Sequence, residues 1–146
     1  MQEGKLSGAI PLGWTASSPR NGGDSSAALT LSEGDSLRIV FRSVDLDSAA
    51  AAYFSKRGLA DLASLTRTLH DSTAGTGRSG IDRFSLEGRD YASYEVKTGG
   101  KRTRVVVFTA GGCYFECEAG VVGRGVGAAT YKRLFSAQQT VLRSLR

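Results

Sequence analysis

The sequence predicts an α+β fold, in which helices flank both faces of an antiparallel meander sheet and form an α/β/α sandwich. Three observations predict it. Residues 91–118 hold three strand-like runs joined by Gly99-Gly100 and Gly111-Gly112, and paired glycines allow the positive φ angles of two-residue hairpin turns. These strands carry apolar residues on both faces, so each face needs a cover. Helical spacing of apolar residues in regions 48–69 and 128–146 supplies one cover for each face.

The N-terminal segment predicts a short edge strand over residues 7–15. Pro11 lies within it, and a proline cannot donate to the ladder of a central strand. Trp14 is expected to cap the core. Residues 16–26 are rich in turn-forming types and predict a polar loop.

A hairpin and a helix are predicted next. Residues 27–31 and 37–42 alternate in polarity on either side of a glycine turn, as the strands of a hairpin do. Asp45 or Asp47 then offers an N-cap to a helix over residues 48–57.

The chain then predicts a second helix, a loop and a closing helix. Residues 59–69 place leucines at helical spacing, either as a separate helix or as a continuation through Gly58. Residues 71–80 predict a loop, and residues 84–90 turn the chain into the meander. The last helix is expected over residues 128–146, where terminal arginines suit the helix dipole.

The register of the meander follows from its turns, because residues at equal distances from a two-residue turn face each other. The expected pairs are Glu95 with Arg104, Tyr94 with Val105, Phe108 with Phe115, and Val106 with Cys117. The same counting places Val106, Phe108 and Phe115 on one face of the sheet, and Tyr94, Val105 and Val107 on the other.

Length and charge limit the classes of protein to which this chain can belong. A chain of 146 residues fits a single domain spanning 1–146. No apolar run approaches the ~20 residues that cross a bilayer. The net charge of +5 mildly favours nucleic acid, anionic lipid head groups or an acidic protein as partner. The densest basic group surrounds one hairpin tip and is the candidate interaction surface: Lys97, Lys101, Arg102 and Arg104.

The two cysteines lie in one predicted strand and point to the same side. Four residues separate Cys113 from Cys117, which sets their Cα atoms roughly 13 Å apart, too far for a disulfide. We expect both to be small core residues beside Phe115. A cysteine-dependent enzyme that pairs a thiol with His70, the only histidine, is the weaker alternative.

No catalytic, cofactor or metal site is predicted from the motifs. Gly75 to Gly80 has the spacing of a dinucleotide fingerprint, but a helix precedes it and a strand follows, the reverse of the required context. Glu116 and Glu118 share one strand face and are interpreted as solvated charges. A cation site formed by these two carboxylates with Asp90 is the alternative.

Several short segments resemble the PsbP-like family. They are Ile10 to Trp14, Phe84 to Arg89, the pair Tyr91 and Tyr94, the Gly111-Gly112 turn before Cys-Tyr-Phe, and Phe135 to Leu145. The family includes the extrinsic photosystem protein PsbP and many bacterial envelope proteins and lipoproteins. The resemblance implies the family fold and an accessory role. It transfers no active site, because these segments are turn, core and helix-packing positions.

The leading functional hypothesis is therefore a non-enzymatic binding or accessory domain of the bacterial cell envelope that acts through protein-protein contacts. We expect another envelope protein as partner, and a periplasmic or secreted location after removal of a leader. A lipid anchor before residue 1 and a cytoplasmic location both stay open. The second hypothesis is a domain that binds a small ligand or anion in a pocket between the sheet and the 48–69 helix. Nucleic acid is not favoured, because a sheet covered on both faces offers no stacking platform.

Overall fold

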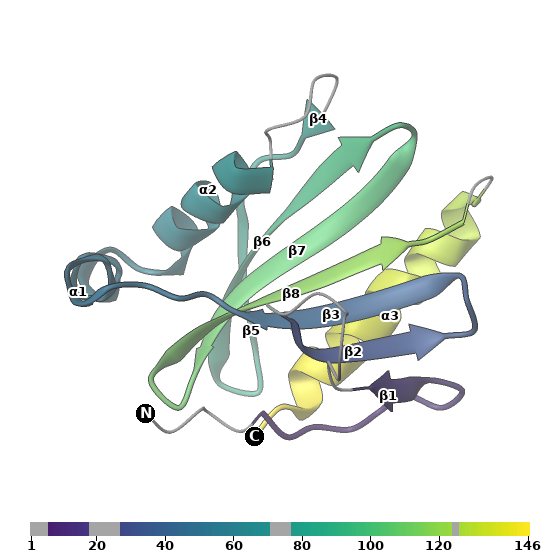
Figure 1. Cartoon of the computed structure of the whole chain (residues 1–146), viewed down its shortest axis with the longest axis horizontal. Helices are drawn as coiled ribbons and strands as arrows, with labels where there is room; N and C mark the ends of the chain where they lie inside the picture. Colours follow the sequence, from purple (N-terminus) through teal and green to yellow (C-terminus); the bar gives the residue numbers. More distant parts are fainter. Residues whose placement is uncertain (1–5, 18–26, 71–76, 124–125) are drawn as a thin grey trace.

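The computed structural model describes residues 6–17, 27–70, 77–123 and 126–146, and Figure 1 shows their arrangement. The elements in chain order are β1 (Thr15–Ser17), β2 (Ala27–Glu33), β3 (Leu37–Ser43), α1 (Ser48–Arg57), α2 (Leu59–His70), β4 (Gly77–Arg78), β5 (Asp82–Leu86), β6 (Arg89–Thr98), β7 (Lys101–Ala110), β8 (Cys113–Val121) and α3 (Ala128–Ser144). The predicted loops at 16–26 and 71–80 lie largely outside the described residues.

The strands form one antiparallel sheet in the order β1-β2-β3-β8-β7-β6-β4, and β5 also pairs with β6. The predicted register of the meander is confirmed. Glu95 faces Arg104 across the first Gly-Gly turn, and Phe108 faces Phe115 across the second. All four turn glycines have positive φ, between 57° and 79°, which explains why glycine occupies these positions.

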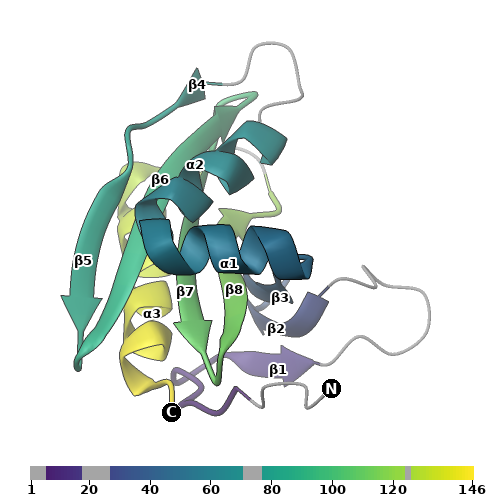
Figure 2. The ribbon, with the colours of Figure 1, turned by 90° about the vertical axis from the view of Figure 1, so that its left-hand side faces the viewer.

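Helices cover both faces of the sheet, so the predicted sandwich is confirmed. α1 and α2 lie on one face and α3 on the other (Figures 1 and 2). α2 packs mainly on β6 and β7, with Leu62 and Ala63 buried against Val105 and Val107. None of the helices in the described ranges is long and apolar enough to cross a membrane.

The larger part of the core lies between the sheet and α3. Leu134 and Leu142 of α3 are buried there with aromatic rings of the sheet. Phe108 is stacked on Phe115 at 5.6 Å between ring centroids and contacts Phe41 edge-on at 6.3 Å. Trp14, 8% exposed, belongs to this cluster and caps it as predicted.

α1 is delimited by an N-cap at its start and by a glycine at its boundary with α2. The Asp47 carboxylate accepts a hydrogen bond from the Ala50 amide at 2.7 Å, which caps the start of α1. Gly58 has φ of 94° and its amide bonds the Phe54 carbonyl. The positive φ breaks the helical path, so the structure has two helices where the sequence allowed one.

The predicted edge strand at 7–15 is wrong in its bounds. The Trp14 amide donates to the Pro11 carbonyl at 3.0 Å, and Gly13 has φ of 83°. This turn interrupts the segment, and the strand begins only at Thr15. The turn predicted over 84–90 is shorter than expected, because β5 and β6 continue to a tight turn at Glu87-Gly88.

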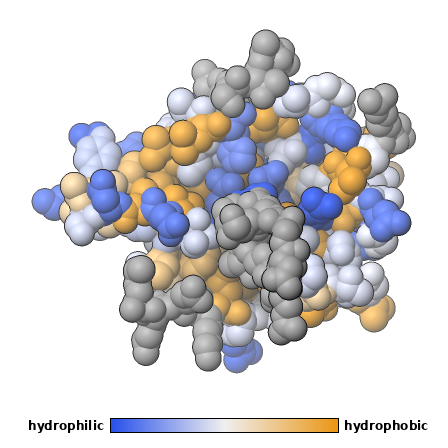
Figure 3. Space-filling view, viewed as in Figure 1, coloured by the Kyte–Doolittle hydropathy of each residue, from blue (hydrophilic) through white to orange (hydrophobic). Residues whose placement is uncertain are grey.

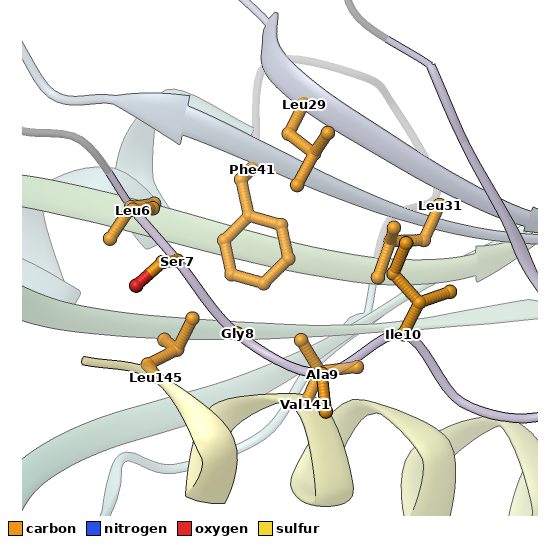
Figure 4. Close-up of a pocket in the computed structure, with 10 residues that line it drawn as sticks. All are labelled: Leu6, Ser7, Gly8, Ala9, Ile10, Leu29, Leu31, Phe41, Val141 and Leu145. Carbon is orange, nitrogen blue, oxygen red and sulfur yellow. The ribbon is translucent and has the colours of Figure 1, made fainter.

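Residues 6–10, which precede the turn between Pro11 and Trp14, close one end of the core. The Ala9 amide donates to Ser144 Oγ at 2.7 Å, and the Arg146 amide donates to the Ser7 carbonyl at 2.9 Å. Figure 4 shows Leu6 to Ile10 between α3 and the strands that carry Leu29, Leu31 and Phe41. The apolar cavity left there has a volume of about 30 Å³, far too small for an organic ligand.

Candidate functional site

A cluster of charged residues lies on the α2 face of the sheet, where α2 ends. Glu116 and Glu118 of β8 share one face of the sheet, because side chains two apart in a strand point to the same side. The contact of Glu116 with His70 of α2 identifies it as the α2 face. β3 pairs with β8 and sets Arg42 opposite Glu116. α2 packs over β6 and β7, and its last residue, His70, lies beside β8. Figure 3 keeps the view of Figure 1 and shows hydrophobic residues next to hydrophilic ones on the left-hand side of the molecule, which carries α1 and α2.

The charged side chains contact each other in two pairs. His70 Nε2 lies 3.0 Å from Glu116 Oε1, and Arg42 donates to Glu118 Oε2 at 2.8 Å. One potential ligand atom from each of His70, Glu116 and Glu118 lies within 4.8 Å of the others. The Glu116 side chain is only 10% exposed, whereas His70 is 31% and Glu118 28% exposed. The cluster is therefore anchored in the sheet and open on one side.

The carboxylates favour the charged form of His70. The hydrogen bond to Glu116 raises the pKa of His70 above 6.5, and the negative charges of Glu116 and Glu118 act in the same direction. Burial and the positive charge of Arg42 lower this pKa, but they do not cancel the rise. The imidazole therefore holds a proton more firmly than a histidine in water.

Tyr94 of β6 is buried next to the cluster and lies close to His70. Its ring centroid lies 6.3 Å from that of His70, and its hydroxyl donates to Thr66 Oγ1 at 2.9 Å. Burial raises the pKa of Tyr94, so the phenol remains neutral. The bond ties α2 to β6 one helical turn before His70 and limits the positions that the imidazole can take.

Comparisons with known proteins agree on the fold. The solution structure of cyanobacterial PsbP (CyanoP) from Synechocystis sp. PCC 6803 matches with a TM-score of 0.60 at 16% identity, over 97% of this chain and 85% of that chain. The crystal structure of LpqN, involved in cell envelope biogenesis of Mycobacterium tuberculosis, matches with a TM-score of 0.54 at 15% identity, over 96% of this chain and 81% of that chain.

The chain has the PsbP-like fold. The resemblance inferred from short sequence segments is therefore confirmed at the level of architecture. No protein-family model and no curated protein sequence matches this chain. At 15–16% identity the similarity is one of fold, and any role for individual side chains has to be argued from their own geometry.

On this PsbP-like sheet, the carboxylates of the predicted cation site do not all meet. Glu116 lies opposite Val107, which in turn lies opposite Ala92. Asp90 is therefore two strands and two residues away from Glu116, roughly 12 Å, and it bonds Ser85 instead. His70 takes the place that the sequence analysis gave to Asp90.

The basic residues of the predicted interaction surface fall into two groups. Lys97 is exposed near the tip of the β6–β7 hairpin, and Lys101 Nζ donates to the Val122 carbonyl at 3.2 Å. Arg102 bonds both carboxylate oxygens of Glu95, at 2.8 and 2.9 Å. Arg102 and Arg104 are held on the α3 face, whereas the two lysines lie toward the tip.

Aromatic rings of α3 and β5 fix the two arginines. The guanidinium carbon of Arg102 lies 5.3 Å from the ring centroids of both Tyr131 and Phe135. That of Arg104 lies 5.6 Å from the Phe84 ring, and burial lowers the pKa of its guanidinium. These cation–π contacts hold the arginines in defined positions.

The cysteines lie on the α3 face, away from the charged cluster. Both are free, and both pack in or against the core that contains Phe115. Burial raises the pKa of the Cys117 thiol to about 12, which removes the thiolate that a nucleophile needs. His70 lies on the opposite face, so the structure does not bring the predicted Cys–His pair together.

The face beneath α1 and α2 was the predicted place for a small-ligand pocket. Large side chains pack between these helices and the sheet, among them Phe54, Leu62 and Tyr94, each no more than 8% exposed. The described part of this layer is thus filled by the protein's own core.

Proposed function

We propose that this PsbP-like domain is a non-enzymatic accessory domain of the bacterial cell envelope that binds another envelope protein. The observation that carries the proposal is the fold, shared over nearly the whole chain with LpqN, a protein involved in cell envelope biogenesis. The burial of Cys117 and its position on the face opposite His70 also support a role other than cysteine-dependent catalysis.

We further propose that the basic surface at the β6–β7 hairpin makes the contact. Its members are Lys97, Lys101, Arg102 and Arg104. Arg102 and Arg104 are already fixed by Glu95 and by aromatic rings, so little side-chain entropy would be lost when an acidic partner binds. The lysines at the tip add positive charge, which accelerates the encounter with a negatively charged surface.

A pull-down from fractionated native host cells tests this function. We expect a protein of the envelope fraction to be retained. Replacing Lys97 and Lys101 by glutamate should reduce its recovery severalfold at about 0.1 M salt, where the Debye length is about 10 Å. Lys56→Glu is the matched control, because Lys56 is exposed at the end of α1, on the opposite side of the molecule in Figure 1.

Two results would contradict the proposal. Equal recovery with the hairpin variant and the Lys56→Glu control would remove the hairpin as the contact surface. Retention of cytosolic proteins or nucleic acid alone, lost at about 1 M salt, would contradict the envelope accessory role itself.

A further inference from the structure

We propose that His70, Glu116 and Glu118 form a binding site for a divalent transition metal ion of the zinc class. This site lies on the α2 face and is separate from the hairpin surface of the proposed function. The inference rests on four kinds of observation: the distances among the ligand atoms, the chemical nature of the ligands, the charges around them, and the rigidity of the elements that carry them.

The distances fit a shared ion. Zinc lies about 2.0–2.2 Å from histidine nitrogen and carboxylate oxygen, so two ligands of one tetrahedral ion are roughly 3.4 Å apart. His70 Nε2 and Glu116 Oε1 are 3.0 Å apart, and the Glu118 ligand atom completes a group within 4.8 Å. A small rotation of the Glu118 side chain would bring its carboxylate to the ion.

The ligand types select the class of metal. An imidazole nitrogen with two carboxylates suits zinc and its neighbours in the first transition row. Calcium and magnesium prefer all-oxygen surroundings with six or more ligands. With three protein ligands, the fourth position of a tetrahedral zinc ion would be taken by water from the exposed side, where His70 and Glu118 are 31% and 28% exposed.

The charges also fit a cation. With a neutral imidazole, the two carboxylates and the guanidinium of Arg42 sum to one negative charge. Arg42 donates to Oε2 of Glu118, and a carboxylate has acceptor sites on both oxygens. Glu118 can therefore bind the ion while it keeps its bond to Arg42.

The ligands are carried by rigid elements. Glu116 and Glu118 belong to a central strand with neighbours on both sides, β3 and β7. His70 ends a helix that is fixed to the sheet by buried Leu62 and by the bond from Tyr94 to Thr66. Sites built on strands and helices are held more tightly than sites on loops, so binding would require little rearrangement.

Zinc titration of the unmodified protein tests the site, using protein without a histidine tag. Isothermal calorimetry with zinc ion alone should show saturable binding of one ion per chain. The chain contains a single histidine, so the imidazole ¹⁵N signals report on His70 directly. We expect zinc to shift the Nε2 resonance more than that of Nδ1.

His70→Gln and Glu116→Gln should each weaken zinc binding at least about tenfold. Glu33→Gln is the matched control, because Glu33 pairs with Arg133 at another place, and it should bind zinc like the unmodified chain. Circular dichroism checks the folding of each variant. The imidazole signals of the unmodified protein provide a readout that does not depend on any variant.

Three results would overturn the proposal. One is the absence of saturable binding at millimolar zinc. Another is zinc binding of unchanged strength in the folded His70→Gln variant. The third is calcium binding as tight as zinc binding with no shift of the imidazole signals, which would indicate an oxygen-only site elsewhere on the chain.

Discussion

At the residue scale, the pair of His70 and Glu116 makes stability depend on pH. Because the pKa of His70 is raised in the folded state, the stabilisation is fully present below the unfolded value of about 6.5. It is lost as pH rises through the higher folded pKa. The free energy of unfolding should therefore fall on going from about pH 6 to above that pKa.

Urea unfolding at a series of pH values, with a chelator present, measures this effect. Glu116, Glu118 and Arg42 are the charged groups that act on His70. His70→Gln is the control, because it removes the titrating group, and the fall should disappear in this variant. An equal fall in both proteins would show that another group is responsible.

Of the three proposed ligands in the charged cluster, Glu116 and Glu118 could be placed together from the sequence and His70 could not. Strand alternation places Glu116 and Glu118 on one face wherever that strand lies. His70 is 46 positions from Glu116 in the chain, and its place depends on how α2 crosses the sheet. No local sequence pattern predicts the angle at which α2 crosses the sheet. The sequence analysis named Asp90 as the third ligand instead, because the sequence does not show how far apart two residues on one face of the sheet lie.

At the element scale, the attachment of α3 depends on polar contacts as well as on its apolar stripe. The Tyr91 hydroxyl donates to the Leu142 carbonyl at 2.8 Å, near the C-terminal end of α3. Gln138, fully buried, donates to the Cys117 carbonyl at 3.0 Å. Carbonyls in the last turn of a helix lack their usual i+4 partner, and the Leu142 carbonyl accepts from the Tyr91 hydroxyl in addition to the Leu145 amide, which lies 3.3 Å away.

Tyr91→Phe should lower the free energy of unfolding by about 1 kcal/mol, because the buried Leu142 carbonyl loses the shorter of its two hydrogen bonds and keeps that of the Leu145 amide, while the ring stays in place. Thermal or urea unfolding measures the change. Tyr53→Phe is the control, since Tyr53 is 48% exposed, and it should be close to neutral. A loss below about 0.3 kcal/mol for Tyr91→Phe would mean that water or the Leu145 amide satisfies the Leu142 carbonyl without Tyr91.

The elements that were predicted well have strong local signals. Asp47 and Gly58 delimit α1, and the Gly-Gly turns fix the meander, because these residues act within a few positions of themselves. The bounds predicted for the edge strand, 7–15, were wrong because the pattern of polar and apolar residues there fits both a strand and an extended segment without strand pairing. Its real conformation depends on contacts with Ser144 and Arg146 at the other end of the sequence.

At the scale of the whole molecule, one sheet separates two clusters of buried residues. Leu134 lies in the cluster beneath α3, and Leu62 in the cluster beneath α2. Both clusters take alternate residues of the same strands, such as Val106 and Val107 of β7. The same backbone hydrogen bonds of each strand hold the side chains of both faces in place, so the two clusters depend on one sheet. We therefore expect residues 1–146 to unfold as a single domain.

The only tryptophan, Trp14, lies in the α3 cluster and makes this expectation testable. Leu62→Ala removes a fully buried side chain on the opposite face and should cost about 2–5 kcal/mol. In a single domain, the urea midpoint seen by Trp14 fluorescence should fall together with that seen by far-ultraviolet circular dichroism. Leu69→Ala is the control on the same helix, because Leu69 is 69% exposed, and it should shift neither midpoint. A Trp14 transition that stays in place in Leu62→Ala, while the dichroism transition moves, would show that the two faces unfold independently.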